Sequence, residues 1–321
     1  MDTLMGSLCS LPVVEARLGT AQALLCVAQR PAFQAALPAE AMPALMTILK
    51  STTQYLLSRT HPSSDCVDAA MPALIVFLSN KASSSLGALA AVLLAELEHF
   101  RAPMMAAALP RLVGLVSSPA NSISRSLAAT AILQLAESVG SRMHIARMAL
   151  QELALVLEDA FIAHHPCSIL QARDVAAAFM CVMGHQPDAS LRRMVAHAAL
   201  ESLVSILRDP LWPDQEGQAH AAWALQHLAK EAALQRIVAA AALPALVTSM
   251  SVASSQEVRL AAAEAIAALA ATKDAQLRCT INLQARAVLC CGVNDKADPQ
   301  IRKAAVKALR RLRPPRFCGL M

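Results

Sequence analysis

The residues with the clearest potential for chemistry are His164-His165-Pro166-Cys167. Imidazole and thiolate groups are common Zn²⁺ ligands, but no second cluster with zinc-site spacing accompanies this one. We therefore interpret it as a polar loop and predict no metal site. The sequence contains no nucleophile elbow, P-loop, GxGxxG or HExxH motif, and its 9 glycines are too few for a phosphate-binding loop. These features predict a non-enzymatic protein with no catalytic residues and no cofactor.

A second group of residues could bind a partner protein. His220, Trp223 and His227 are spaced i, i+3 and i+7, which places them on one face of a helix. A solvent-facing Trp between imidazoles is typical of an interface hot spot. The alternative is that Trp223 packs on a neighbouring helix and the histidines are solvated. Trp212 lies between two prolines in a long connection, where it either docks a partner or caps its own part of the fold.

Basic residues gather at the end of the chain. Residues 301–321 hold seven bases and no acid, which leaves 21 bases against 23 acids for residues 1–300. We predict that this segment contacts an acidic protein surface, and the alternative is a solvated cap on the last helix. RNA and anionic membranes fit less well, because no aromatic platform or long amphipathic anchor accompanies the charge. The residues proposed for this contact are Arg310, Arg311, Arg313 and Arg316.

The elements that position these residues are predicted to be helices. The chain contains 68 alanines but only 6 Phe, 2 Trp and 1 Tyr. Alanine is the best helix former and aromatic residues favour strands, so this composition excludes a β-sandwich or barrel. The mean hydropathy of +0.46 is high, but charged residues are spread along nearly the whole chain. We therefore predict no membrane span.

Two sequence patterns alternate along the chain. One long pattern occurs six times. The residues four, seven, eight and eleven places after its first position are apolar, and the residue seven places after it is always Ala. The pattern begins at positions 84, 124, 171, 217, 258 and 301. This spacing predicts one buried stripe per helix. Between these helices lie segments such as Leu109-Pro110 and Leu243-Pro244, with related segments at Leu150 and Leu200. Because Pro fits the first turn of a helix, each segment is predicted to start a second helix.

The pattern resembles the armadillo repeat family. The segment from Gln235 to Val247, followed by Glu257-Val258-Arg259, is similar to one armadillo repeat. Such a repeat consists of a short helix, a second helix that begins with Leu-Pro, and a long third helix. The resemblance covers residues 10–313 and implies an all-α, right-handed α-α superhelix of about seven repeats. It departs from the family at Ala107 and Ala241, where Gly is usual. Asp298 to Arg302 also resembles the related HEAT repeat.

The repeat pattern also sets the expected domain organisation. We expect one solenoid over residues 1–313, a truncated repeat near residues 42–62, and a basic tail over residues 314–321. Import adaptors of the armadillo family carry a Trp followed four places later by an Asn in successive repeats. Here only Trp223 is present, and His227 replaces the Asn. We therefore predict that this protein is not an import-signal receptor. The other residues at the Asn position are Cys26, Leu94, Gln134, Cys181, Ala268 and Arg311.

These observations predict a protein-binding scaffold or adaptor. One alternative is a structural subunit of a large permanent assembly, for example a ciliary or cytoskeletal one. Another is a HEAT-like pigment lyase, which this chain resembles in its Ala-rich repeats. The first sixteen residues contain two acids and no base, so we expect no signal peptide and a cytoplasmic location, with cytoskeletal, ciliary or nuclear sites as alternatives. The nine cysteines form no CxxC pair and are expected to be buried, reduced hydrophobic residues.

Overall fold

A computed structural model describes residues 71–79 (except 73 and 76), 84–95, 98–118, 122–158, 166–209, 215–252, 255–295 and 298–312. Every regular element in these ranges is a helix, and no strand occurs in them, as the composition predicts. The elements are α6 (Ser84–Ala95), α7 (Glu98–Ala107), α8 (Leu109–Val116), α9 (Ser122–Ala136), the short 3₁₀ helix η1 (Val139–Ser141), α10 (Arg142–Glu158), α11 (Pro166–His185), α12 (Ala189–Arg208), α13 (Gln215–Ala229), α14 (Gln235–Val252), α15 (Gln256–Leu269), α16 (Ala275–Val293) and α17 (Pro299–Leu312).

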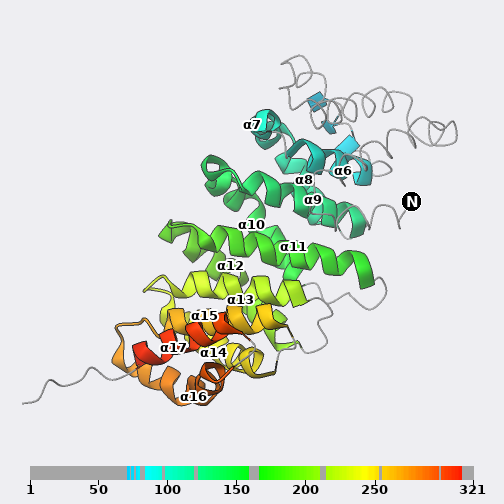
Figure 1. The fold of residues 1–321 in the computed structure, drawn as a ribbon. Coiled ribbons are helices and arrows are strands. Elements are labelled where there is room, and N and C mark those ends of the chain that lie inside the picture. The colour runs from blue at the N-terminus through cyan, green and yellow to red at the C-terminus, as the bar shows by residue number, and fades with distance from the viewer. Residues whose placement is uncertain are drawn as a thin grey trace, which may run out of the picture. The chain divides into compact units, whose positions relative to one another are not determined.

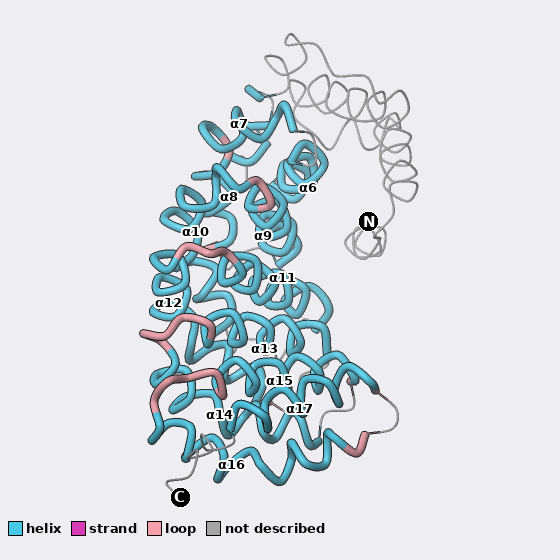
Figure 2. Tube along the Cα trace, turned by 60° about the vertical axis from the view of Figure 1, so that its left-hand side comes forward, coloured by secondary structure: helices cyan, strands magenta, loops and turns pink. Residues whose placement is uncertain are grey.

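The chain forms two compact units, Met1–Val175 and Ala176–Met321, and the division falls inside α11. In the first unit, α6 packs on α9, and α8 packs on α10 (Figure 1). In the second unit, α13, α15 and α17 lie side by side in one layer, while α12, α14 and α16 form the other (Figure 2). Each unit is therefore a stack of repeated helix pairs, which is the arrangement that the sequence repeats predict.

The alanines of the repeat pattern are the points where neighbouring helices meet. Ala91, Ala131, Ala224, Ala265 and Ala308 are all 0% exposed. A methyl side chain at these positions allows two helix backbones to approach closely, and the larger residues beside it fill the space around the contact. The predicted buried stripe is confirmed in α9, α13 and α15, and also in α6 and α17 except at Val92 and Leu309, which are half-buried.

In α11 the buried stripe is displaced from the predicted one. Ala178 is only half-buried, whereas Phe179, Met180 and Met183 are 0% exposed. The stripe lies one residue later than the spacing predicts, and Phe179 rather than an alanine occupies its central position. The sequence pattern was ambiguous here because three successive alanines, residues 176–178, match the expected stripe in more than one register.

The segments at Leu109, Leu150, Leu200 and Leu243 are each predicted to start a helix. This prediction is correct at Leu109 and wrong at the other three. Helix α8 begins at Leu109, with Pro110 in its first turn. By contrast, α14 runs unbroken from Gln235 to Val252 with Pro244 inside it. Helices α10 and α12 likewise continue through Leu150 and Leu200. Ala241 permits α14 to continue, because Ala favours a helix where Gly would favour a helix end, but it is not sufficient alone, since α7 ends at the equivalent Ala107.

Polar contacts join residues one repeat apart. The hydroxyls of Ser84 and Ser124 lie 3.0 Å apart and are 40 residues apart in sequence. Gln256 donates to the carboxylate of Asp298 over 2.6 Å, across 42 residues. The same Asp298 accepts from the backbone N–H groups of Gln300 and Ile301, so it also caps α17. The predicted repeat step of roughly forty residues is therefore the step between contacting helices.

Some predicted features lie outside the described residues. They are the truncated repeat near residues 42–62, His164 and His165, Trp212, Arg313, Arg316 and the tail over residues 314–321. The described part of the chain holds no group of three His, Cys, Asp or Glu side chains placed to bind a metal. No helix in that part has both the length and the apolar character that crossing a bilayer requires.

The expectation that the cysteines are buried is wrong for α16. Cys279, Cys290 and Cys291 are exposed there, and Cys181 on α11 is half-buried. The physical reason is that α16 buries only the narrow stripe formed by Ile281, Ala285, Leu289 and Gly292. The three thiols lie off that stripe.

Candidate protein-binding surface

The α13–α15–α17 layer presents equivalent positions of three repeats next to one another. In the repeat register, Trp223, Glu264 and Lys307 are equivalent, and so are His227, Ala268 and Arg311. Contacts between the helices follow this register. Lys307 on α17 pairs with Glu264 on α15 at 2.8 Å, and Arg311 donates to the carbonyl oxygen of Ala267 at 2.8 Å. The layer is thus crossed by side chains that connect one repeat with the next.

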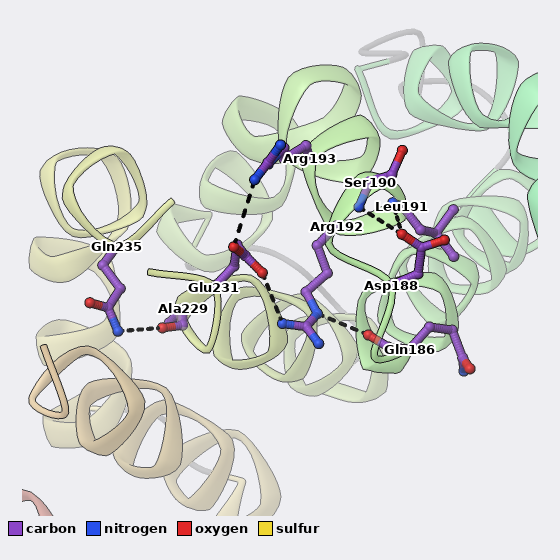
Figure 3. Close-up of polar contacts among 9 residues, drawn as sticks. All are labelled: Gln186, Asp188, Ser190, Leu191, Arg192, Arg193, Ala229, Glu231 and Gln235. Atoms are coloured by element: carbon purple, nitrogen blue, oxygen red, sulfur yellow. Dashed lines mark hydrogen bonds and ion pairs between the residues drawn. The ribbon is translucent and has the colours of Figure 1, made fainter. Parts of the chain in front are cut away.

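The corners after α11 and α13 are each held by a side chain that returns to the end of the preceding helix. Arg192 of α12 donates through Nε to the carbonyl oxygen of Gln186 at 2.9 Å, and through a second nitrogen to Glu231 at 3.3 Å (Figure 3). Gln235 of α14 donates in the same way to the carbonyl oxygen of Ala229 at 3.0 Å. These donors satisfy carbonyl groups that have no partner inside the helix.

The same contact recurs in the first unit. Arg101 donates to the carbonyl oxygen of Ala95 at 2.9 Å, and Arg142 donates to that of Ala136 at 2.7 Å. In each case the donor is six residues after the acceptor. A guanidinium group at a helix C-terminus is also favoured by the helix dipole. This recurring donor was missed at the sequence level, although an Arg shortly after a long apolar helix is visible in the sequence.

At the end of α13, Lys230 and two histidines form a connected group. The amine of Lys230 lies 3.0 Å from Nδ1 of His227, and Nε2 of His227 lies 3.3 Å from Nδ1 of His185. The two rings meet edge to face, with centroids 4.6 Å apart. Because an ammonium group can only donate, Nδ1 of His227 is the acceptor and its proton is on Nε2. His227 thus donates onward to His185.

Electrostatics at this group are dominated by positive charge. Burial lowers the pKa of His227 to about 3, and the nearby charges of Lys230, His185 and Arg192 act in the same direction. Burial also lowers the pKa of Lys230, as do Arg192 and Lys307, while Glu264 opposes them. Burial raises the pKa of the Cys181 thiol to about 11. His227 is therefore neutral, and the positive charge lies on Lys230.

A cavity of about 580 Å³ opens on this layer, and we call it the basic cavity. Its lining holds four cations, Lys230, Lys273, Lys307 and Arg311, and two anions. One of the anions, Asp274, is already engaged: it caps α16 through the N–H groups of Gln276 and Leu277 and pairs with Arg236 at 2.6 Å. The N–H of Leu277, together with Arg236, keeps the pKa of Asp274 below its usual range.

The predicted site residues occupy different environments. His227 is 8% exposed and makes both of its ring contacts inside the protein. Trp223 and His220 are half-buried, and Nδ1 of His220 is buried without a hydrogen-bond partner in the described part of the chain. A direct role of these three residues in partner binding stays a prediction.

The two residues of the predicted basic cluster that lie on α17, Arg310 and Arg311, occupy different environments. Arg310 and Arg311 are both exposed, but only Arg311 lines the basic cavity. Arg311 therefore belongs with Lys230 and Lys307, a grouping that differs from the predicted cluster of Arg310, Arg311, Arg313 and Arg316. The signal for this grouping was present in the repeat register, because Arg311 and His227 occupy equivalent positions and Lys230 follows His227 by three residues.

A second cavity of about 320 Å³ lies on the other layer, between α14 and α16. Its lining includes Ala240, Pro244, Leu277 and Thr280. Of the two helices that form it, α14 carries Ile237, which is 57% exposed, and α16 carries Leu283, which is 84% exposed. This cavity supplies a useful comparison for experiments on the basic cavity.

Comparisons with solved structures identify the fold. A computationally designed armadillo repeat protein for modular peptide recognition matches with a TM-score of 0.65 and 22% identity, over 75% of this chain and 99% of that one. An engineered protein matches with a TM-score of 0.66 and 18% identity, over 96% of this chain and 77% of that one. No family model and no curated protein sequence matches the chain.

A third solved structure was determined with a ligand. It is a designed armadillo repeat protein in complex with the peptide (KR)4, which matches with a TM-score of 0.57 and 20% identity, over 84% of this chain and 98% of that one. Together with the repeated helix pairs described above, these matches show that the chain has an armadillo-type all-α repeat fold. The resemblance inferred from the sequence is confirmed at the level of fold.

Proposed function

We propose that the chain is a noncatalytic protein-binding scaffold whose α13–α15–α17 layer binds an extended segment of a partner protein. The observation that carries this proposal is the basic cavity, because it lies on the layer where successive repeats present equivalent side chains. Repeat arrays generally bind their partners on such extended surfaces. The use of designed armadillo proteins for peptide recognition supports the same type of ligand.

The basic end of the chain extends this proposal. Arg310 is exposed on α17 next to Arg311, and Arg313 and Arg316 follow in the sequence. We include these residues as a second contact for an acidic partner surface. The competing interpretation is that these bases form a solvated charged face and contact no partner. An adaptor role fits both contacts.

The test is a blocked variant of the basic cavity with a matched control. Ala271 is exposed and lines the basic cavity, and Ala240 is exposed and lines the cavity between α14 and α16. Random peptides displayed on phage are selected on the purified chain, and the affinities of the selected peptides are measured by fluorescence polarisation. We expect Ala271→Trp to abolish peptide binding and Ala240→Trp to preserve it. Failure to select any peptide whose binding depends on Ala271 refutes the proposal.

A structural subunit of a permanent assembly is the second candidate. It is favoured by the exposed side chains of Ile237 and Leu283, because large apolar groups in water are typical of a surface that a partner covers. In that case Ala240→Trp, rather than Ala271→Trp, removes the interaction. The same pair of variants therefore separates the two candidates.

A further inference from the structure

We propose that the basic cavity binds the carboxylate groups of an extended acidic segment of a partner protein, with Lys230, Lys307 and Arg311 as the cations that contact them. This inference rests on the proposed function and names its ligand. It follows from the charges that line the cavity, from how each cation is held, and from the small residues in its lining.

The three cations differ in how far their charge is already neutralised. Lys307 pairs with Glu264 at 2.8 Å, so part of its charge is balanced. Arg311 makes its described contact with a neutral carbonyl group, that of Ala267. Lys230 makes its described contact with neutral His227. Two of the three cations are therefore held in place by neutral acceptors, and an incoming carboxylate can pair with them without displacing an internal acid.

The arrangement fixes the cations before a ligand arrives. The guanidinium group of Arg311 spans from α17 to α15, and the amine of Lys230 is tied to the ring of His227, which is itself bonded to His185. Side chains that are already ordered lose less conformational entropy on binding. Burial lowers the pKa of Lys230, and repulsion from Arg192 and Lys307 lowers it further; an anion bound beside Lys230 relieves this repulsion.

Small and polar residues complete the lining. Ala268 and Ala271 also line the cavity, and their small side chains leave room for a peptide backbone. Gln226 also lines the cavity, is 9% exposed, and has an amide oxygen with no hydrogen-bond partner among the described residues. Among the described residues, the lining contains no aromatic side chain on which a nucleobase could stack.

The charge also excludes one class of ligand. A Lys/Arg-rich peptide places like charges against Lys230, Lys307 and Arg311, which is unfavourable at this close range. Where a designed armadillo protein binds the peptide (KR)4, the lining of this cavity favours a peptide of opposite charge. The sequence also lacks the Trp and Asn residues that import adaptors of the armadillo family carry in successive repeats.

The experiment uses the purified full chain and three fluorescein-labelled octapeptides, with alternating Asp-Glu, Ser-Gln or Lys-Arg sequences. Affinities are measured by fluorescence polarisation at about 50 mM and about 200 mM NaCl. We expect the Asp-Glu peptide to bind about tenfold more tightly than the Ser-Gln peptide, the Lys-Arg peptide to bind most weakly, and the preference to shrink at the higher salt concentration.

Two matched double variants locate the contact. Lys230→Gln with Arg311→Gln removes two charges from the basic cavity, and Arg302→Gln with Lys303→Gln removes two charges from exposed positions of α17 outside it. Their net charge is equal, so a general electrostatic effect acts on both. We expect the first pair to weaken binding of the Asp-Glu peptide by about tenfold and the second by less than about twofold. Circular dichroism melting confirms that both variants remain folded.

Three outcomes overturn the inference. Equal affinity for the Asp-Glu and Ser-Gln peptides, with binding still abolished by Ala271→Trp, refutes the acidic ligand and leaves the proposed function standing. Equal losses in the two double variants place the contact outside the cavity. Tighter binding of labelled poly-uridylate than of the Asp-Glu peptide, lost when Lys230 and Arg311 are replaced, assigns the cavity to nucleic acid. Absence of any Ala271-dependent peptide, including from the phage library, refutes the proposed function itself.

Discussion

The amine of Lys230 donates to Nδ1 of His227 over 3.0 Å, so a buried imidazole on the proposed binding layer is held neutral beside a cation. The relationship links stability with function. Protonation of His227 would remove the acceptor of Lys230 and add a second positive charge. The first prediction concerns this proton.

The free energy of unfolding should decrease as the pH is lowered, because His227 must take up a proton on unfolding. Its pKa is about 3 in the folded protein, against an ordinary value of 6.5. Between these values the unfolded chain binds a proton that the folded chain does not. The free energy of unfolding therefore decreases as pH falls below about 6.5, by at most about 1.4 kcal/mol per pH unit from this one group. In His227→Gln this contribution is absent, and urea titrations of both proteins at about pH 7.5 and about pH 5 measure the difference. Identical pH slopes would contradict the assignment.

Arg192 should stabilise the corner between α11 and α12, and its link to Glu231 after α13, far more than its neighbour Arg193 does. Arg192→Ala leaves the carbonyl of Gln186 and the carboxylate of Glu231 without this donor, and we expect a loss of about 1–3 kcal/mol. Arg193 is 61% exposed and lies 4.0 Å from Glu231, so Arg193→Ala should change stability by less than about 0.5 kcal/mol. Chemical denaturation of the two variants measures both effects. Equal losses would show that the contact with Gln186 adds nothing.

Gly87 marks a close approach that no side chain can share. A Cβ atom there would lie 2.8 Å from the backbone nitrogen of Leu78 and 2.9 Å from the carbonyl carbon of Phe77. Gly87→Ala should therefore destabilise the first unit by about 1–3 kcal/mol. Gly114 in α8 has nothing within 4 Å of that position, so Gly114→Ala should stabilise the protein by about 0.5–1 kcal/mol. Thermal melts of both variants check the predicted opposite signs.

Pro244 and Pro110 should respond differently to replacement by alanine. Pro244 lies inside α14, where it removes a helix hydrogen bond, so Pro244→Ala should raise the free energy of unfolding by about 1–3 kcal/mol. Pro110 lies in the first turn of α8, where no bond is lost, so Pro110→Ala should lower stability by about 0.4–1 kcal/mol through the entropy of the unfolded chain. A loss of stability in Pro244→Ala would indicate that the ring itself is needed, for instance to set the path of α14.

The sequence was sufficient to predict the helix layers but not their details. Residues such as Ala224 and Ala265 repeat at fixed spacing, and burial follows that spacing directly. Pro244 shows where local rules fail, because packing of a continuous α14 on its neighbours outweighs the cost of an internal proline. In α11, the run of alanines left the register open until Phe179 and Met183 were placed in the core.

The candidate site was predicted only in part. Trp223 and Arg311 were selected because of their types, and the repeat register placed them on α13 and α17, with α15 between these two helices. The contact of Lys230 with His227, and its grouping with Lys307, depend on how α13, α15 and α17 are spaced. Distances between helices follow from packed volumes, which residue spacing along one helix does not encode.

The contacts between repeats also bear on how the chain reaches its native state. The polar contacts described above span at most 44 residues, the separation of Arg311 and Ala267. Folding rates rise when contacting residues are close in sequence, because short loops cost little entropy to close. Each helix pair can therefore order on the pair before it while the chain is still being synthesised, without waiting for a distant segment. A nascent chain released at residue 230 should already protect the backbone amides of α12 from hydrogen exchange.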